Sequence, residues 1–256
     1  MAVRCFLDLS YDGTAYHGWQ RQPESISVQQ VLEEKLSSLL GSDTTVIGCG
    51  RTDTGVHASA FYAHFEWEGE FGSRFANWEQ ACWKLNGMLP PDIGVRRIFE
   101  VGEQDHARFS AAERAYTYWI HTDKDPFLEG RSARIYEDLD LEAMNAAAAM
   151  LVFQGEFDAF QKTGGGQKTT ICDVRHAQWT RTEAHRLRFD ITADRFLRNM
   201  VRAIVGTLID IGKGRMAPEA MAEVIASKDR SRAGTCLLYT SPSPRDLSTS
   251  RMPSSA

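Results

Sequence analysis

The chain has 256 residues, 43% of them hydrophobic, and a formal net charge of -5 at pH 7. This length allows one large domain or two modest ones with their own cores. No apolar run approaches the roughly 20 residues that span a bilayer, and the N-terminus lacks the apolar region of a signal peptide. We therefore expect a cytoplasmic protein without a membrane segment. The five cysteines show no CxxC spacing, which argues against a disulfide framework and a thiolate zinc site.

The first half of the chain reads as strands mixed with helices. Apolar residues alternate over Val3–Tyr11, which predicts a half-buried strand, and a turn follows at Asp12-Gly13. Ser27 and Gln30 have the spacing of a capping box, and an apolar stripe then predicts a helix as far as Leu40. Further strands are predicted at Thr45–Cys49 and Phe61–Trp67, and a second helix at Trp78–Leu85.

The second half repeats this type of arrangement. Strands are predicted at Arg114–Ile120, Asp173–Trp179 and Arg186–Thr192, and helices at Leu141–Phe153 and Phe196–Ile211, the last ended by Gly212. The sequence therefore predicts an α+β protein of two units, with a boundary near residues 101–105.

Charge is unevenly distributed along the chain. Acidic residues outnumber basic ones between residues 123 and 142, whereas basic residues predominate between 186 and 215. An acidic protein with this distribution can still carry a basic surface that binds nucleic acid. On the last predicted helix, Arg195, Arg198 and Arg202 are spaced to form one basic stripe, opposite apolar positions such as Met200 and Ile204. Such a stripe is most often a solvated face.

The most informative segment runs from Gly48 to Ala58, where glycines flank the triplet Arg51-Thr52-Asp53 between two predicted strands. A loop of this kind can hold one carboxylate at the mouth of a cleft. Spacing alone favours a structural turn in which Asp53 caps local amides. His57 and His64 have no third ligand at recognisable spacing, so a structural or hydrogen-bonding role is expected for them rather than metal binding.

Residues 50–58 resemble the signature loop of the TruA family of tRNA pseudouridine synthases, with Thr54 in place of the more usual alanine. Other blocks similar to the family occur in the same order along the chain. They are Tyr11-Asp12-Gly13-Thr14, Gly18-Trp19-Gln20, Val28-Gln29, Leu85-Asn86, Leu89-Pro90, residues 106–111, residues 114–118 and residues 196–206. The resemblance covers nearly all of residues 3–235.

The resemblance implies two tandem ferredoxin-like domains that form a continuous antiparallel-rich sheet around a basic central cleft. It also implies a homodimer that needs no metal or organic cofactor and isomerises uridines 38, 39 and 40 of the tRNA anticodon stem-loop. A non-catalytic tRNA-binding or chaperone-like protein, or a truncated and poorly folded product, is the alternative.

The family's site residues match four positions here. Asp53 would be the catalytic carboxylate, and Arg51 would help hold the target uridine flipped out of its helix. Tyr116 would lie against the target base, whereas Tyr118 is expected in the core. Arg202 would pair with Asp53 and keep it ionised, and Arg198 is a weaker candidate for phosphate contact.

The C-terminal segment departs from the family pattern. Residues 1–103 are predicted to form the first domain and residues 104–235 the second. Residues 236–256 lack the family's final strand and are rich in serine and proline, which predicts a disordered or artefactual tail.

Overall fold

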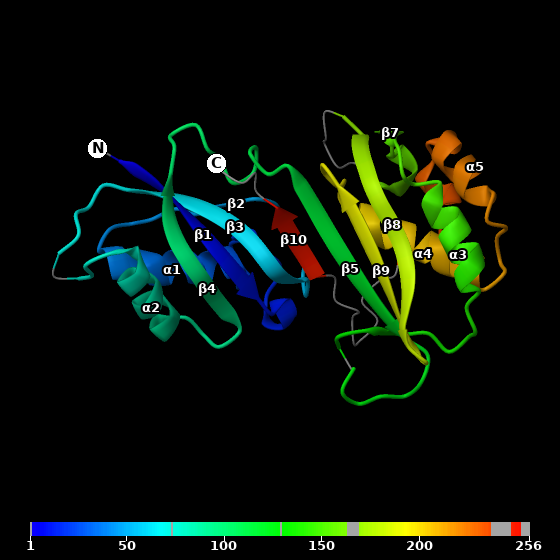
Figure 1. Ribbon diagram of the computed structural model, residues 1–256, viewed down its shortest axis with the longest axis horizontal. Helices are drawn as coiled ribbons and strands as arrows, with labels where there is room; N and C mark the ends of the chain where they lie inside the picture. The colour runs from blue at the N-terminus through cyan, green and yellow to red at the C-terminus, as the bar shows by residue number, and fades with distance from the viewer. Residues whose placement is uncertain (1, 73, 129, 163–168, 237–246, 252–256) are drawn as a thin grey trace. The chain divides into compact units, whose positions relative to one another are not determined.

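The computed structural model describes residues 2–72, 74–128, 130–162, 169–236 and 247–251. The chain divides into two compact units. The first comprises Met1–Ala112 and Leu247–Ala256, and the second comprises Glu113–Asp246. The division falls later than residue 103 because residues 103–107 bond to the first unit: Arg4 Nη1 donates to the carbonyls of Glu103 and Asp105. Each unit packs helices against a sheet (Figure 1), which confirms the predicted α+β class.

The first unit is built around a largely antiparallel sheet. Its elements are β1 (Val3–Tyr11), η1 (Gly13–Ala15), α1 (Val28–Leu40), β2 (Ile47–Gly48), β3 (His57–Trp67), α2 (Trp78–Met88), β4 (Ile93–Val101) and β10 (Leu247–Arg251). The strand order is β4-β1-β3-β10, and β2 pairs with β3. As predicted, the Ser27 side chain caps α1 by accepting from the Gln30 amide at 3.2 Å.

The second unit has a sheet in the order β5-β9-β8-β7, with β6 beside β5. Its elements are β5 (Glu113–His121), β6 (Ala133–Arg134), α3 (Leu141–Ala149), β7 (Gln154–Glu156), η2 (Asp158–Phe160), β8 (Ile171–Glu183), β9 (Arg186–Ala193), α4 (Met200–Gly212), α5 (Ala220–Ser227) and η3 (Arg230–Arg232). Alternate residues of β5, β8 and β9, such as Tyr118, Trp179 and Phe189, are buried in one core with α3 and α4. No helix among the described residues is long and apolar enough to cross a membrane.

Part of the predicted tail has regular structure. Leu247–Arg251 forms β10, which pairs in parallel with the beginning of β3. This differs from the disorder that the serine- and proline-rich composition predicts, because main-chain pairing depends on the backbone and tolerates polar side chains. Residues 237–246 and 252–256 lie outside the described part of the chain.

Candidate active site

The loop between β2 and β3 presents Arg51 and Asp53 to solvent and buries the residue between them. Thr52 is only 7% exposed, and its hydroxyl lies 2.9 Å from the phenol oxygen of Tyr11. The Thr52 carbonyl accepts from the Trp19 amide at 3.2 Å. Thr52 therefore anchors the loop on both its side chain and its backbone, and the two charged residues that flank it project outward.

Two glycines of the preceding segment let it pack directly against this loop. A Cβ on Gly13 would lie 2.0 Å from the carbonyl oxygen of Val56, and a Cβ on Gly18 would lie 2.3 Å from that of Thr52. Gly18 also has a left-handed φ of 85°, which favours glycine. The glycines in the blocks at residues 11–14 and 18–20 thus have a direct structural reason, which is close contact with the Asp53 loop.

Further hydrogen bonds hold the part of the loop that follows Asp53, both within the loop and to residues 12–16. The Gly55 amide donates to the carbonyl of Tyr16 at 3.2 Å, and the Val56 amide donates to that of Asp53 at 3.2 Å. His57 Nδ1 lies 3.1 Å from the Gly13 amide and 3.0 Å from a carboxylate oxygen of Asp12. His57 therefore has the hydrogen-bonding role expected from the sequence.

Tyr16 and Asp12 both bond to Asp92, which fixes the segment that packs against the loop. The Tyr16 hydroxyl donates to Asp92 at 2.6 Å, and the Asp12 amide donates to the carbonyl of Asp92 at 2.8 Å. Burial and the neighbouring Asp92 carboxylate raise the pKa of Tyr16 above its ordinary value. Tyr16 accordingly stays a neutral hydrogen-bond donor throughout the physiological pH range.

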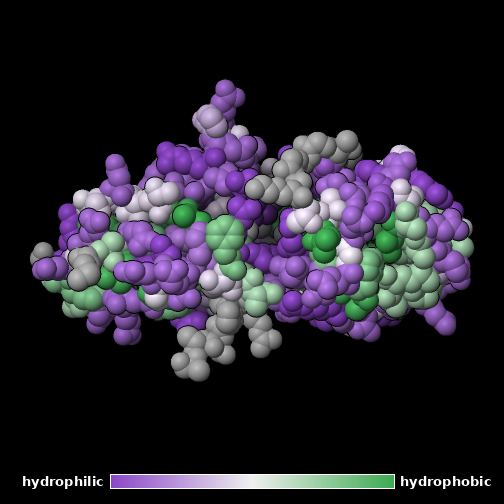
Figure 2. Space-filling model, turned by 90° about the horizontal axis from the view of Figure 1, so that it is seen from above, coloured by the Kyte–Doolittle hydropathy of each residue, from purple (hydrophilic) through white to green (hydrophobic). Residues whose placement is uncertain are grey.

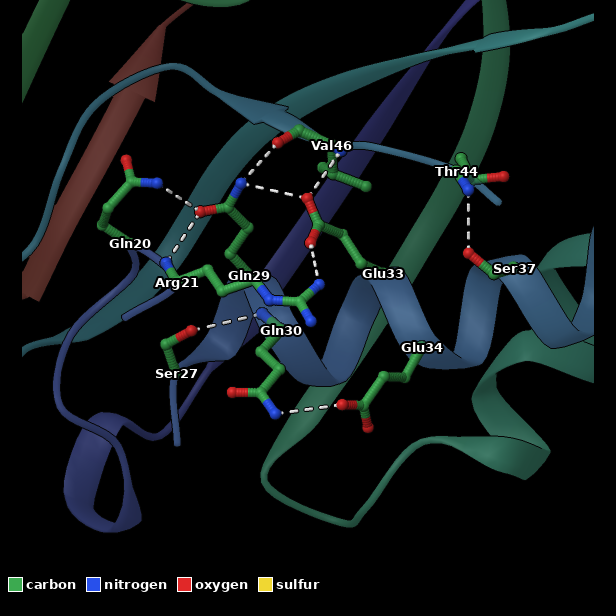
Figure 3. Close-up of polar contacts among 10 residues, drawn as sticks. All are labelled: Gln20, Arg21, Ser27, Gln29, Gln30, Glu33, Glu34, Ser37, Thr44 and Val46. Carbon is green, nitrogen blue, oxygen red and sulfur yellow. Dashed lines mark hydrogen bonds and ion pairs between the residues drawn. The ribbon is translucent and has the colours of Figure 1, made fainter. Parts of the chain in front are cut away.

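A polar network joins Gln29 and Glu33, two buried residues of α1, to the segments on either side of this helix (Figure 3). Gln29 Oε1 accepts from the Gln20 side chain at 2.8 Å and from the Arg21 amide at 2.9 Å, while Gln29 Nε2 donates to Glu33 at 3.0 Å and to the Val46 carbonyl at 2.9 Å. Glu33 Oε1 accepts in turn from the Val46 amide at 3.0 Å. These bonds hold the segment at Gln20–Arg21 and the backbone of Val46, just before β2 and the loop, against α1.

In the second unit, Tyr116 and Tyr118 lie on the same face of β5 but in different surroundings. Tyr118 is 1% exposed and belongs to the core, as predicted. Tyr116 is half-buried at the core margin, with its ring 5.1 Å from that of Phe196 and nearly perpendicular to it. Tyr116 therefore offers an aromatic ring that is braced from one side.

The predicted basic stripe is wrong in one respect. Helix α4 begins at Met200, so Arg195 and Arg198 precede it and only Arg202 lies within it. Asn199 has a left-handed φ of 64°, and this conformation interrupts the helical path that the apolar spacing predicts from Phe196. Arg198 is exposed, and its carbonyl accepts from the Lys162 amide at 3.0 Å. Arg202 is half-buried in the first turn of α4, while Met200 and Ile204 are buried as expected.

The candidate residues thus form two sets, each placed by its own unit. Arg51 and Asp53 share the braced loop of the first unit, and Tyr116, Arg198 and Arg202 belong to the second. The sequence reading missed Thr52, Tyr16 and the Gln29–Glu33 pair, because their contributions depend on contacts with residues distant in the chain. Among the described residues, no cluster of histidine, cysteine or carboxylate side chains has the arrangement of a metal site.

Comparison with known proteins finds close relatives along almost the whole chain. Residues 147–243 match a family model described as tRNA pseudouridine synthase. The chain is 46% identical over 232 residues to the tRNA pseudouridine synthase A of Bacteroides fragilis, which covers 91% of this chain and 90% of the relative. It is 47% identical to that of Bacteroides thetaiotaomicron (91% and 85% covered) and 39% identical to tRNA pseudouridine synthase A 2 of Clostridium perfringens (90% and 93% covered).

Proposed function

The chain belongs to the tRNA pseudouridine synthase A family and is therefore an isomerase that converts uridine in tRNA to pseudouridine; from this premise we propose that Asp53 is its catalytic carboxylate and that it acts at positions 38, 39 and 40 of the anticodon stem-loop. The observation that carries the proposal is the bracing of one loop. Thr52 and the glycine contacts at Gly13 and Gly18 hold the backbone on both sides of an exposed carboxylate. A rigid loop can keep a reactive group in position without binding energy being spent on ordering it.

The isomerisation of uridine to pseudouridine requires one nucleophilic or charge-stabilising group. The bond between N1 of uracil and C1′ of ribose breaks, the base turns, and a bond forms from C5 to C1′, while the C5 proton leaves and N1 gains a proton. The product contains the same atoms as the substrate at the same overall oxidation state, so the reaction needs no external oxidant or reductant. A carboxylate such as Asp53 can engage the ribose or the base while the glycosidic bond is open.

The other candidate residues support this step. We assign to Arg51 the task of occupying the space that the target base leaves when it flips out, since a planar, permanently charged group can replace its contacts. Tyr116 would lie against the flipped base, with Phe196 bracing its ring from the side. Arg202 would pair with Asp53 and orient its carboxylate, and Arg198, exposed just before α4, would contact phosphate.

The finer architecture is part of the same proposal. The two units would be tandem ferredoxin-like domains whose sheets continue into each other around a basic cleft, and the active enzyme would be a cytoplasmic homodimer without a metal or organic cofactor. The α+β content and the helices packed against each sheet support this arrangement.

Incubation of the purified chain with unmodified tRNA transcripts tests the proposal. Transcripts that carry uridine at only one of positions 38, 39 and 40 separate the three targets, and chemical mapping locates the product. We expect pseudouridine at each of these positions. Tight tRNA binding without any product would favour the non-catalytic tRNA-binding protein, and product outside the anticodon stem-loop would refute the assigned target region.

A further inference from the structure

Two exposed cations of the second unit, Lys162 and Arg198, come from distant parts of the chain and are joined through their backbones. The Lys162 amide donates to the Arg198 carbonyl at 3.0 Å, and both residues are exposed. Buried neighbours anchor the two segments in the core, Phe160 for one and Leu197 and Met200 for the other. The core therefore fixes the points at which the two cations emerge, and we call them the Lys162–Arg198 pair.

The Lys162–Arg198 pair differs from most exposed charges in having no carboxylate partner. Hydrophilic residues cover most of the face drawn in Figure 2, so exposure alone does not single out a binding residue. Across the described residues, no hydrogen bond or ion pair involves the side chain of either member of the pair. By contrast, Lys213 and Lys228 are bound by Glu137 and Glu156. A cation without such a partner can bind a phosphate without first giving up an ion pair.

The carboxylates that lie nearest to the pair in the sequence are already engaged. Asp158 accepts from the Thr170 hydroxyl at 2.8 Å, and Asp194 accepts from the Asp173 amide at 2.8 Å. These two carboxylates hold protein groups in place rather than neutralising the pair. Two cations on joined segments then create a local positive potential, which attracts an anion.

The Lys162–Arg198 pair belongs to the segment that carries the residues proposed to meet the target uridine. Phe196, two residues before Arg198, has its ring 5.1 Å from that of Tyr116. Arg202 follows in the first turn of α4. All of these residues lie in the second unit, so their arrangement does not depend on the placement of the first. The pair is therefore beside the expected position of the flipped base.

We propose that Lys162, together with Arg198, binds the phosphodiester groups that flank the target uridine; this inference rests on the proposed function, which makes tRNA the substrate and places the target base against Tyr116. A nucleotide that leaves its helix turns about its backbone and stays joined to its neighbours through these two groups. Cations bound to them hold the turned backbone in register with the protein.

The two members of the pair suit different parts of this task. The arginine fork binds two phosphate oxygens at once, whereas the lysine ammonium is a compact charge on a flexible stem that follows the position of its phosphate. Lys162 would touch the substrate away from the bonds that form and break. We therefore expect its loss to weaken tRNA binding and to change the chemical step little.

The first test compares Lys162→Gln with Lys124→Gln. Lys124 is the matched control, because it is also exposed and has no carboxylate bond among the described residues, but it follows the end of β5 that is remote from Tyr116. Both variants should unfold at the same temperature as the unmodified chain, since neither side chain makes a bond that is lost. Binding of full-length tRNA is measured over a series of salt concentrations, together with kcat and KM.

We expect Lys162→Gln to raise the Kd and KM for tRNA about tenfold at physiological salt and to lower the slope of log affinity against log salt by about 1, the value for one lost phosphate contact. Lys124→Gln should change affinity less than about twofold, because its charge acts on the tRNA only from a distance. The kcat of both variants should stay close to that of the unmodified chain.

The second test removes phosphate charges instead of protein charges. A neutral methylphosphonate is placed on the 5′ or the 3′ side of uridine 39, or in the acceptor stem as the control linkage. We expect one of the two flanking substitutions to weaken binding by the unmodified chain about tenfold and binding by Lys162→Gln less than twofold, because the variant has already lost that contact. The acceptor-stem substitution should affect both proteins equally.

Equal losses of affinity in Lys162→Gln and Lys124→Gln would overturn the proposal, since they would reflect net charge alone. Unchanged tRNA affinity in Lys162→Gln would also overturn it, as would a flanking methylphosphonate that weakens the variant as much as the unmodified chain. An unmodified chain that binds tRNA but makes no product would refute the catalytic assignment of Asp53, while the comparison of linkages would still report on the phosphate contact.

Discussion

Replacing Gly18 with alanine should disable the Asp53 loop while leaving the fold in place. The new Cβ would lie 2.3 Å from the Thr52 carbonyl oxygen, whereas ordinary contacts begin at 3.4 Å, so the loop or the Gly18 segment must move by about 1 Å. A displacement of about 1 Å in a catalytic group can lower a rate about a hundredfold. The left-handed φ of Gly18 adds a conformational cost of about 1–2 kcal/mol for alanine.

Single-turnover formation of pseudouridine in tRNA measures the first effect, and thermal or urea unfolding measures the second. Gly50→Ala is the matched control in the same loop, because a Cβ at Gly50 meets nothing within 4 Å and its φ is not positive. We expect Gly18→Ala to fold, with a rate lowered about a hundredfold, and Gly50→Ala to stay within about threefold of the unmodified chain. Full activity of Gly18→Ala, or an equal loss in both variants, would refute the bracing argument.

Three further predictions concern the remaining residues. Tyr116→Phe should lower kcat more than Tyr118→Phe, because only Tyr116 is placed outside the closed core; equal losses would contradict its contact with the base. Arg202→Met should lower kcat, since Asp53 would lose the cation proposed to pair with it; an unchanged kcat would exclude the pairing. Burial, with smaller contributions from neighbouring cations, lowers the pKa of His64 from 6.5 to about 4. The unfolded chain therefore binds a proton between pH 6.5 and 4 that the folded chain does not, and stability should be lost as pH falls through this window, by up to about 3 kcal/mol. His64→Gln should flatten that dependence in urea unfolding, and a parallel curve for both proteins would contradict it.

Local signals in the sequence predict local structure here. The α1 cap at Ser27 follows from spacing within one turn of helix, and the strand pattern of Val3–Tyr11 follows from alternation. The start of α4 could not be predicted in this way. Apolar spacing continues from Phe196 without a break, whereas the left-handed conformation of Asn199 is a property of one residue that periodicity does not report.

The candidate site is predictable in its charged residues and not in their support. Arg51 and Asp53 stand out between glycines, and the family resemblance adds roles to them. The support comes from Thr52 meeting Tyr11, and from Gln29 joining Gln20 to Val46, and these partners are up to 41 positions apart in the chain. Nothing in the local pattern distinguishes such a threonine or glutamine from an ordinary polar residue.

Asp53→Asn tests the central claim most directly, because the amide keeps the shape of the side chain and removes its charge and nucleophilicity. Pseudouridine formation is followed under single-turnover conditions with saturating enzyme, and tRNA affinity is measured in parallel. We expect no detectable isomerisation by the variant, with a Kd for tRNA within a few-fold of the unmodified chain. Substantial turnover by Asp53→Asn would contradict the assignment of Asp53 as the catalytic carboxylate.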